Sequence, residues 1–348
     1  AALARRIKEL GRSLGFAAVG IGGVELDADE ARLLAWLNAG RHGDMDYMQR
    51  HGTVRSRPAE LVPGTLRVIS VRMNYWPPQT RTAEAVLDDP LRGYVSRYAL
   101  GRDYHKLMRQ RLQRLADRIG AEIGLFGYRA FSDSAPVLEK ALAQQAGLGW
   151  IGKHTNLIEQ HSGSWFFIGE LYTDLPLPLD NSGVAAANHC GSCHACIDAC
   201  PTGAIVAPYQ LDARLCISYL TIELRGSIPE PLRPFIGNRI YGCDDCQLVC
   251  PWNRFASLTA EPDFAPRHAL DNAMLGDLFA WSESEFLDHT AGSAIRRIGY
   301  ECWLRNIAVA LGNAPTTADV IAALQTRREH PSALVREHVG WALGKHSE

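Results

Sequence analysis

The apolar residues of the N-terminal part recur at helical spacing in three segments. The first carries an apolar residue every three or four positions, at Leu3, Ile7, Leu10 and Leu14. Segment 27–40 begins with acidic residues and ends at Gly40, which predicts a helix with a glycine at its C-terminal cap. Segment 105–124 predicts a helix whose arginines face outward and whose apolar residues face inward, at Leu112, Leu115, Ile119 and Ile123.

Two segments rich in apolar residues lie among these helices. Segments 66–75 and 164–172 are short, are rich in β-branched and aromatic residues, and predict buried strands. Helical and strand-like segments therefore alternate over residues 1–180. This is the pattern of a layered α/β domain, within a chain whose overall class we expect to be α+β.

The remainder of the chain divides at a proline-rich stretch. Segment 175–183, LPLPLDNSG, predicts a linker into a cysteine-rich domain at residues 181–258. Residues 259–348 show helical spacing, and within them segments 294–314 and 330–346 share a spaced arginine, apolar triplets and the letters ALG. These shared features predict helical repeats of the HEAT type, which stack and offer an extended surface.

Composition and charge narrow the class of protein. The chain has 348 residues, is 47% hydrophobic and carries a formal net charge of −2, so any surface for nucleic acid has to be local. We find no apolar run long enough to span a bilayer. The Arg5–Arg6 pair is followed by charged Lys8, Glu9 and Arg12 where an export signal needs apolar residues. We therefore expect a cytoplasmic protein without membrane contact, in which nine cysteines favour metal ligation over disulfides.

Four of the cysteines lie within eleven residues. They follow the pattern C-x2-C-x2-C-x3-C-P, by which bacterial ferredoxins bind iron–sulfur clusters, at Cys190, Cys193, Cys196 and Cys200. Short loops let three thiolates converge on one cluster, and the fourth, before the proline, ordinarily binds a second cluster. The motif therefore predicts a second set of thiols elsewhere in the chain.

A shorter run supplies that second set. It reads C-x2-C-x3-C-P at Cys243, Cys246 and Cys250, and Cys216 completes a count of eight. By the crossed arrangement, one [4Fe–4S] cluster is expected on Cys190, Cys193, Cys196 and Cys250, and the other on Cys200, Cys216, Cys243 and Cys246. Zinc is the alternative, although it favours C-x2-C pairs separated by a longer loop. Cys302 lies in a helical apolar pattern and is expected in the core.

Together with other stretches, these cysteine runs resemble the epoxyqueuosine reductase family. The resemblance rests on the two runs, on YALGRDYHKLM at 98–108, on FSDSAPVLEKALAQQAGLGWIGKHTNLI at 131–158 and on the terminal repeats, and it covers essentially the whole chain in order. It implies a cobalamin-dependent oxidoreductase of tRNA modification, which converts epoxyqueuosine to queuosine at the wobble position of the tRNAs for Asp, Asn, His and Tyr codons. The N-terminal domain is implied to bind the corrinoid, as in the related reductive dehalogenases.

The chemistry of the reaction agrees with this resemblance. Deoxygenation of an epoxide to an alkene needs two electrons and protons, whereas iron–sulfur clusters pass one electron at a time. A two-electron reductant has to stand between them, and cobalamin serves that role. The resemblance implies Asp133 as the proton donor to the leaving oxygen, and we expect it to have a raised pKa. A helix is expected to start at Ser134–Pro136, with Glu139 and Lys140 on its exposed face.

Further residues are expected to contact the corrinoid. The candidates for hydrogen bonds to its amide arms are Arg57, Arg97, Tyr98, Lys153, His154 and Asn156. Ser218 and Tyr219 follow Cys216 and are expected near the cofactor if Cys216 binds the nearer cluster. The sequence has no D-x-H-x-x-G, the stretch that supplies a histidine ligand to cobalt in other cobalamin proteins. We therefore expect a corrinoid without a protein histidine on cobalt.

Contact with the tRNA anticodon stem-loop has to come from local positive charge. Basic residues crowd the C-terminal helices and flank the cysteine domain at Arg225, Arg233, Arg296, Arg297, Arg305, Arg327, Arg328, Arg336 and Lys345. Together they predict a track for phosphates. The leading candidates are Arg225, Arg296, Arg297 and Arg305. An external low-potential electron donor is a further expected partner.

Two other functions remain open on the sequence. An enzyme like the reductive dehalogenases would use the same mechanism on a small molecule, but such enzymes usually carry an export signal and have no need of a helical repeat domain. An iron–sulfur electron carrier without catalysis would leave about 180 residues and Asp133 without a role.

Overall fold

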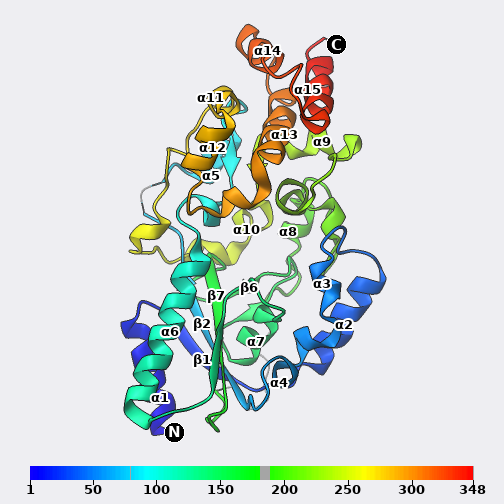
Figure 1. The fold of residues 1–348 in the computed structure, drawn as a ribbon. Helices are drawn as coiled ribbons and strands as arrows, with labels where there is room; N and C mark the ends of the chain where they lie inside the picture. The colour runs from blue at the N-terminus through cyan, green and yellow to red at the C-terminus, as the bar shows by residue number, and fades with distance from the viewer. Residues whose placement is uncertain (79, 181–188, 348) are drawn as a thin grey trace.

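The computed structural model describes residues 1–78, 80–180 and 189–347. Figure 1 shows the N-terminal layers at one end of the molecule, the C-terminal helices at the other, and the cysteine-rich part between them. The predicted domain boundary at residue 181 falls within 181–188, outside the described residues. The division into three domains at the predicted positions therefore stays a prediction.

A four-stranded antiparallel sheet organises the N-terminal part. Its strands lie in the order β1 (Ala18–Gly22), β2 (Arg67–Asn74), β7 (Phe166–Thr173) and β4 (Tyr128–Phe131). Both strands predicted from apolar runs are confirmed, as β2 and β7, and they form the central pair. Central strands with helices on both faces are buried on both sides, so most residues of β2 and β7 are buried, polar ones included.

Helices cover both faces of this sheet. α1 (Ala2–Ser13) and α6 (Tyr104–Ile123) pack together on one face, and α7 (Glu139–Gln145) packs on the other (Figure 1). The residues predicted to face inward from α1 and α6 belong to this first core, with one exception. Ile123 is exposed, because it lies in the last turn of α6 where the chain leaves the helix.

A second helical segment follows β1 and lies beside the sheet. The helix predicted to end near Gly40 is α2 (Asp27–Asn38), and Gly40 has a φ of +63°, the left-handed conformation that glycine adopts without strain. Two short helices come next, α3 (Tyr47–Arg50) and α4 (Pro58–Leu61). They carry the chain around the edge of the molecule to β2 (Figure 1).

The loop before α7 departs from the prediction. The helix expected to start at Ser134–Pro136 begins at Glu139. The N–H of Ser134 donates to the carbonyl of Ser132, and the N–H of Val137 donates to that of Ala135. Segment 132–138 therefore forms successive tight turns, which delay the helix.

Short elements shape the cysteine-rich part. They are α8 (Ala195–Asp198), β8 (Ile205–Ala207), β9 (Gln210–Leu211), a π-helical turn (Tyr219–Glu223), α9 (Arg233–Ile236), β10 (Arg239–Tyr241) and α10 (Asp245–Leu248). The helices α8 and α10 of the two cysteine runs contact each other. β10 pairs in parallel with β3 (Tyr94–Val95), so the cysteine-rich part is joined to the N-terminal part by backbone hydrogen bonds. The short strands β5 (Trp150–Ile151) and β6 (Leu157–Ile158) form a hairpin.

The C-terminal part is helical, as predicted. It contains α11 (Leu275–Ala280), α12 (Glu283–His289), α13 (Gly299–Gly312), α14 (Ala318–Gln325) and α15 (Ala333–Lys345). α13 lies in the middle and packs against α11, α14 and α15, and α5 (Ala83–Leu87) lies nearby (Figure 1). Cys302 on α13 is buried in this core, as expected. The HEAT type of the packing stays a prediction. Among the described residues, no helix combines the length and the apolar character needed to cross a membrane.

Candidate active site

Asp133 lies at the centre of a group of polar side chains. Its Oδ2 accepts a hydrogen bond from the Tyr104 hydroxyl, at 2.7 Å, and contacts Nε2 of His105, at 3.0 Å. Its backbone N–H donates to the carboxylate of Glu139 at the start of α7. Asp133 has a φ of +56°, a left-handed conformation that aspartate tolerates better than most residues. The Asp133 carboxylate is thus bonded to α6, and the Asp133 backbone is bonded to α7.

The first turn of α6 supplies both partners of that carboxylate. Asp103 caps the helix by accepting the backbone N–H of His105, and its Oδ1 lies 2.5 Å from Nδ1 of the same histidine. The Tyr104 ring stacks on His105 and on Phe167, with centroids 4.2 Å and 3.8 Å away. His105 is therefore fixed with one carboxylate at each ring nitrogen.

These contacts decide where the protons lie. Desolvation lowers the pKa of His105, but hydrogen bonds and charge from Asp103 and Asp133 prevail and raise it to about 9. Desolvation raises the pKa of Asp133, but hydrogen bonds from His105 and Tyr104 prevail and lower it. At neutral pH the pair is an imidazolium and a carboxylate. The expectation of a raised pKa at Asp133 is wrong, because it did not include His105 as a neighbour.

The raised carboxyl pKa belongs to Glu139 instead. Desolvation, and after it the charge of Asp133, raises the pKa of Glu139 to about 8. Desolvation lowers the pKa of Lys140. The expectation of an exposed helical face is confirmed for Lys140, which is exposed. It is wrong for Glu139, which is half-buried because α7 begins beneath the Asp133 loop and against the sheet.

Side chains that are accessible and yet desolvated mark a recess here. The Asp133 side chain is 51% exposed, although desolvation is the largest influence on its pKa. Lys140 is likewise exposed, and the charge of Cys246 acts on it. Both side chains are therefore accessible and yet have much protein around them, with Cys246 of the cysteine-rich part nearby, and we call these surroundings the recess.

The first group of thiols lies in a cavity of its own. Cys190, Cys193, Cys196 and Cys250 line a cavity of about 230 Å³. Burial raises the pKa of Cys250, and the charges of Cys190 and Cys193 raise it further, so the last cysteine of the second run meets the first run. Among the described residues, no three His, Cys, Asp or Glu side chains converge closely enough to bind one metal ion.

The second group of thiols is half-buried, and desolvation raises the pKa of three of its members. Burial raises the pKa of Cys246 well above its ordinary value, and Cys216 and Cys200 raise it further. Cys243 and Cys216 pack against the same apolar cluster. The charge of Cys196 also acts on Cys246, so the two groups are neighbours. We call the first group, with exposed Cys193, the outer thiols and the second group the inner thiols.

Two of the residues expected to contact a corrinoid lie near the Asp133 group. Tyr98 packs edge-on against Tyr104, and its hydroxyl lies 3.4 Å from that of Tyr241. Arg97 is buried, and its Nε and one of its Nη atoms have no hydrogen-bond partner. Its guanidinium lies over the ring of Trp76, with 5.8 Å to the centroid. A buried guanidinium with unused donors is a feature that a bound polar group would satisfy.

Ser218 and Tyr219 lie at the inner thiols, on the side of α2. The Ser218 hydroxyl donates to the carbonyl of Cys243 at 3.4 Å. The Tyr219 hydroxyl accepts the backbone N–H of Asp44 at 2.8 Å, in the loop that follows α2. Both positions agree with a place between the N-terminal part and the inner thiols, and their contact with a cofactor stays a prediction.

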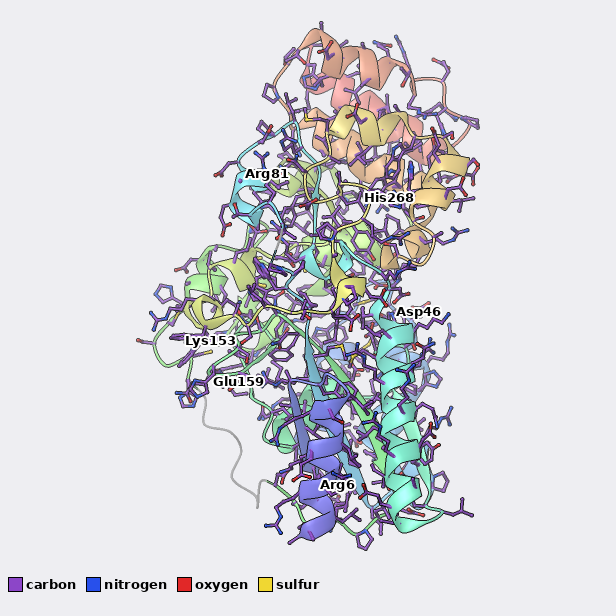
Figure 2. The ribbon with its side chains drawn as sticks, turned by 90° about the vertical axis from the view of Figure 1, so that its left-hand side faces the viewer. Arg6, Asp46, Arg81, Lys153, Glu159 and His268 are labelled. Carbon is purple, nitrogen blue, oxygen red and sulfur yellow. The ribbon has the colours of Figure 1, made fainter. Side chains whose placement is uncertain are left out.

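The other expected corrin contacts lie elsewhere. Lys153 donates to the carbonyls of Gly191 and Cys193 and, with His154, lines the cavity of the outer thiols. Figure 2 shows Lys153 toward one edge of the molecule, far from Arg6 on α1. The backbone N–H of Asn156 donates to Nδ1 of His154, so Asn156 belongs to the same loop. Lys153 and His154 therefore lie beside the outer thiols, and the charge of Lys140 also acts on His154.

Arg57 is also engaged away from Asp133. Its guanidinium donates to both carboxylate oxygens of Glu30, at 2.9 Å each, and to Glu60 at 3.0 Å. The Glu30 and Glu60 pairs hold the loop between α3 and α4 to α2. Its role toward a corrinoid stays a prediction without a supporting contact.

Two of the arginines expected on the tRNA track are buried. Arg305 is 0% exposed, and its guanidinium donates to the carbonyls of Leu220, Leu224 and Gly226. Arg233 is buried and donates to Ile228 and Glu337. The prediction that they contact tRNA is wrong, because both guanidinium groups join the C-terminal helices to the cysteine-rich part and present no surface to a phosphate.

The remaining arginines are accessible. Arg225, Arg296 and Arg297 are exposed where the π-helical turn meets the approach to α13. Arg297 pairs with both carboxylate oxygens of Glu223 at 2.7 and 2.8 Å, and its charge acts on Asp133. Arg297 therefore lies near the recess. Farther out, Arg327 donates to the carbonyl of Trp281. Three more basic residues are exposed on α15 and in the turn before it: Arg328, Arg336 and Lys345.

Sequence reasoning missed Tyr104, His105 and Glu170. The first two follow Asp103 at the start of a predicted helix, where a capping aspartate holds the next residues in place, and this was the available signal. Glu170 lies in the centre of β7 and is 0% exposed. A carboxyl inside a buried apolar run was a second signal, since such a group has to be neutral or paired.

Comparisons with known proteins agree with this site. A family model described as "Epoxyqueuosine reductase QueG, DUF1730" matches residues 55–134, and a model described as "4Fe-4S double cluster binding domain" matches residues 189–253. The chain is 65% identical to an epoxyqueuosine reductase of Pseudomonas aeruginosa, over 100% of this chain and 96% of the relative.

Solved structures share the fold over the whole chain. One is an epoxyqueuosine reductase with an epoxyqueuosine-modified stem loop of tyrosine tRNA, at 29% identity and a TM-score of 0.91, covering 100% of this chain and 91% of that one. Another, from Bacillus subtilis, is described with its aspartate catalytic loop swung out of the active site. It is 29% identical with a TM-score of 0.88, covering 99% of this chain and 90% of that one.

Proposed function

The chain belongs to the epoxyqueuosine reductase family, and we propose how its residues carry out the reduction of epoxyqueuosine to queuosine in tRNA. The observation that carries the activity is the 65% identity to an epoxyqueuosine reductase over the entire chain. The protein is thus an oxidoreductase with a double-cluster iron–sulfur domain. The residues that bind the clusters, the corrinoid and the tRNA are part of the proposal.

The eight thiols are proposed to bind two [4Fe–4S] clusters in the crossed arrangement. The outer thiols bind the cluster that takes electrons from an external low-potential donor, because Cys193 is exposed. The inner thiols bind the cluster that faces the recess, because Cys246 acts on Lys140. The proximity of Cys196 to Cys246 brings the clusters close enough for electrons to pass inward one at a time.

The recess between the inner thiols and Asp133 is the proposed place of cobalamin. Its borders fit such a group, since accessible Asp133 and Lys140 lie on one side and inner Cys246 on another. Tyr98 and Ser218 also lie at this boundary, and Arg97 has donors to spare. Bound there, cobalamin would supply a two-electron reductant to the epoxide. The chain's own part is to orient the wobble nucleotide, exclude water and deliver protons.

Asp133 is proposed to deliver a proton to the oxygen that leaves the epoxide. In the resting protein that proton lies on Nε2 of His105, 3.0 Å from Oδ2 of Asp133. As the leaving oxygen gains negative charge, Asp133 takes the proton from Nε2 of His105 and passes it to that oxygen, which leaves His105 neutral. Asp103 stabilises the imidazolium before transfer and fixes the ring by its bond to Nδ1. The aspartate loop of the B. subtilis relative supports a loop role for this residue.

The tRNA is proposed to approach across the exposed arginines near the recess. Arg297, whose charge acts on Asp133, marks the side from which the wobble base enters. Arg225 and Arg296 extend that surface toward the C-terminal helices. A base in a single-stranded loop can be splayed out to reach such a recess. This role, in tRNA of the Asp, Asn, His and Tyr codons, agrees with a cytoplasmic protein.

Spectral titration with hydroxocobalamin and single turnover of an epoxyqueuosine stem-loop test the proposal together. We expect one cobalamin per chain, bound without a nitrogen ligand from the protein, and conversion to queuosine only when both clusters and cobalamin are present. Electron paramagnetic resonance of the Co(II) state reports an axial nitrogen directly. Conversion without cobalamin, or a nitrogen splitting in the bound state, contradicts the proposal.

A further inference from the structure

The reaction needs more protons than Asp133 and its partner His105 hold at one time. Both carbon–oxygen bonds of the epoxide break, the alkene forms, and the oxygen leaves as water. The balance requires two electrons, which the external donor supplies through the clusters, and two protons. The His105–Asp133 pair holds one transferable proton, because His105 is an imidazolium and Asp133 a carboxylate. A second proton has to be stored close by in a closed site.

A buried carboxyl lies behind the Asp133 loop. Glu170 is 0% exposed in the central strand β7, directly across from Ser70 on β2 and from Phe131 on β4. Neither of its carboxyl oxygens has a hydrogen-bond partner, and the Ser70 hydroxyl is also buried without one. An ionised carboxylate in such a place costs several kcal/mol, so Glu170 is neutral and carries a proton. Burial raises its pKa well above the ordinary value, in agreement with this geometry.

Glu139 connects this buried acid to the active site. Its carboxylate accepts the backbone N–H of Asp133, so the two residues are in contact. On the other side, the charge of Glu139 and a side-chain contact with it raise the pKa of Glu170 further, after the effect of burial. α7, which carries Glu139, packs directly on β7, which carries Glu170. Glu139 therefore lies between Glu170 in the sheet and the backbone of Asp133.

The charges around Glu139 act on its pKa in opposite directions. His105 and Lys140 favour the ionised form, and Asp133 and Glu170 disfavour it. Other titratable side chains that face it are Arg55, Tyr104 and Tyr172. Arg55 is buried and donates to the carbonyl of Tyr47 at 2.9 Å, so it is held near this group without a carboxylate partner. Desolvation and Asp133 prevail, and the pKa of Glu139 is about 8.

We propose that Glu139 and Glu170 store the second proton of the reaction and pass it to Asp133 after Asp133 and His105 have given up the first. The inference rests on the proposed role of Asp133. In the first transfer, Asp133 protonates the leaving oxygen as one carbon–oxygen bond breaks, and His105 becomes neutral. In the second, Glu139 reprotonates Asp133 and Glu170 reprotonates Glu139. Asp133 then gives this proton to the hydroxyl group, which leaves as water as the second carbon–oxygen bond breaks and the two donated electrons complete the alkene. Solvent reloads the acids after product release.

Infrared spectroscopy of the iron-loaded protein without substrate tests the store directly. A neutral carboxylic acid has a C=O stretching band that shifts in D2O and that a carboxylate lacks. We expect Glu170→Gln and Glu139→Gln each to remove part of this band at pH 7, with the Glu139 part titrating near pH 8. Glu122→Gln, at an exposed carboxyl on α6, is the control and leaves the band unchanged. A band unchanged in both variants, or absent from the wild type, overturns the proposal.

Single turnover of the stem-loop gives the functional readout. Gln keeps the shape of Glu and still accepts the Asp133 N–H, so we expect folding and cluster content to be preserved. Glu139→Gln and Glu170→Gln are expected to slow turnover about tenfold or more, and small acidic buffers such as imidazolium are expected to restore it in part. Glu139→Gln should also lose the decline near pH 8. Wild-type rates and pH profiles in both variants contradict the store.

The two proposals fail in different ways. If Asp133→Asn turns over like the wild type, the role of Asp133 is wrong, whatever the infrared band shows. If Asp133→Asn is inactive while both glutamine variants are normal, only the proton store is wrong. Should Glu170→Gln fold poorly, as judged by circular dichroism and iron content, Glu139→Gln alone carries the test through its band, its pH profile and its rescue by buffer.

Discussion

The thiols of residues 189–253 and the acids around Asp133 are assembled in opposite ways. The eight thiols come from two short runs and one neighbouring residue, and α8 and α10 bring the runs together. The acid group comes from the loop at Asp133, the first turn of α6, the start of α7 and the centre of β7. Short local loops position the thiols, whereas packing of helices on a sheet positions the acids.

This difference decides which properties can be changed separately. The thiols need only their spacing and their metal, so a substitution there is expected to act on iron content. The acids depend on one another, because His105, Glu139 and Glu170 owe their protons to Asp133 and to burial. A single substitution among them is therefore expected to act on proton transfer while the clusters remain. Four experiments test this contrast.

Replacing the acid is expected to have the largest effect. Asp133→Asn keeps the shape of the side chain and removes the transferable proton, so turnover should fall about 10²–10⁴-fold. Iron and cobalamin content should stay at the wild-type level. The measurement is single turnover at saturating reductant with iron analysis of the same samples. Loss of iron in this variant would show that the two regions are not independent.

The pH dependence of turnover comes next. The pKa of His105 is raised from 6.5 to about 9, so its proton is fully present below about pH 8 and lost as the pH rises through 9. Above that value the rate should fall about tenfold for each pH unit, after a first decline near pH 8 that belongs to Glu139. Single-turnover rates measured from about pH 6 to about pH 10 follow both steps. A rate that rises above pH 8 would mean that no stored acid limits the reaction.

Charge reversal on the outer surface is expected to act on tRNA alone. Arg296→Glu with Arg328→Glu should weaken stem-loop binding about tenfold at low salt and reduce the salt slope by about 0.7–0.9 for each phosphate that is no longer neutralised. Arg305→Met is the contrast, because Arg305 is buried on backbone carbonyls. It should lower the thermal midpoint by several degrees and leave the salt slope unchanged. A slope that changes only in Arg305→Met would reverse this assignment.

The smallest expected effect is a fall in the iron content. Cys216→Ser should lower it from about eight to about four iron atoms per chain, because it removes one ligand of the inner cluster. Cys302→Ser is the matched control, since Cys302 is buried in the C-terminal core away from both groups. Iron and sulfide analysis after reconstitution measures both. Full iron in the Cys216 variant would show that the crossed ligand sets are assigned incorrectly.

Much of the fold was predictable where local patterns suffice. The apolar runs of β2 and β7, the helical spacing of α1 and α6 and the helical C-terminal part all carry a local signal. The start of α7 was not predictable in this way. Its position depends on the left-handed backbone at Asp133 and on a bond from that residue to Glu139, which sequence spacing does not reveal.

The iron–sulfur chemistry could be inferred from the order of residues, because ligand spacing within a few positions is a local property that packing does not alter. Asp133 could be proposed as the proton donor as well, through the resemblance of the surrounding stretch. The location of the protons could not, because a pKa depends on burial and on charges that distant segments contribute. Folding places a proton on His105 and raises the pKa of Glu139 and Glu170. Arg305 and Arg297 are both arginines in one helical pattern, and folding gives them different places. Arg305 joins two parts of the chain, whereas Arg297 lies near the recess.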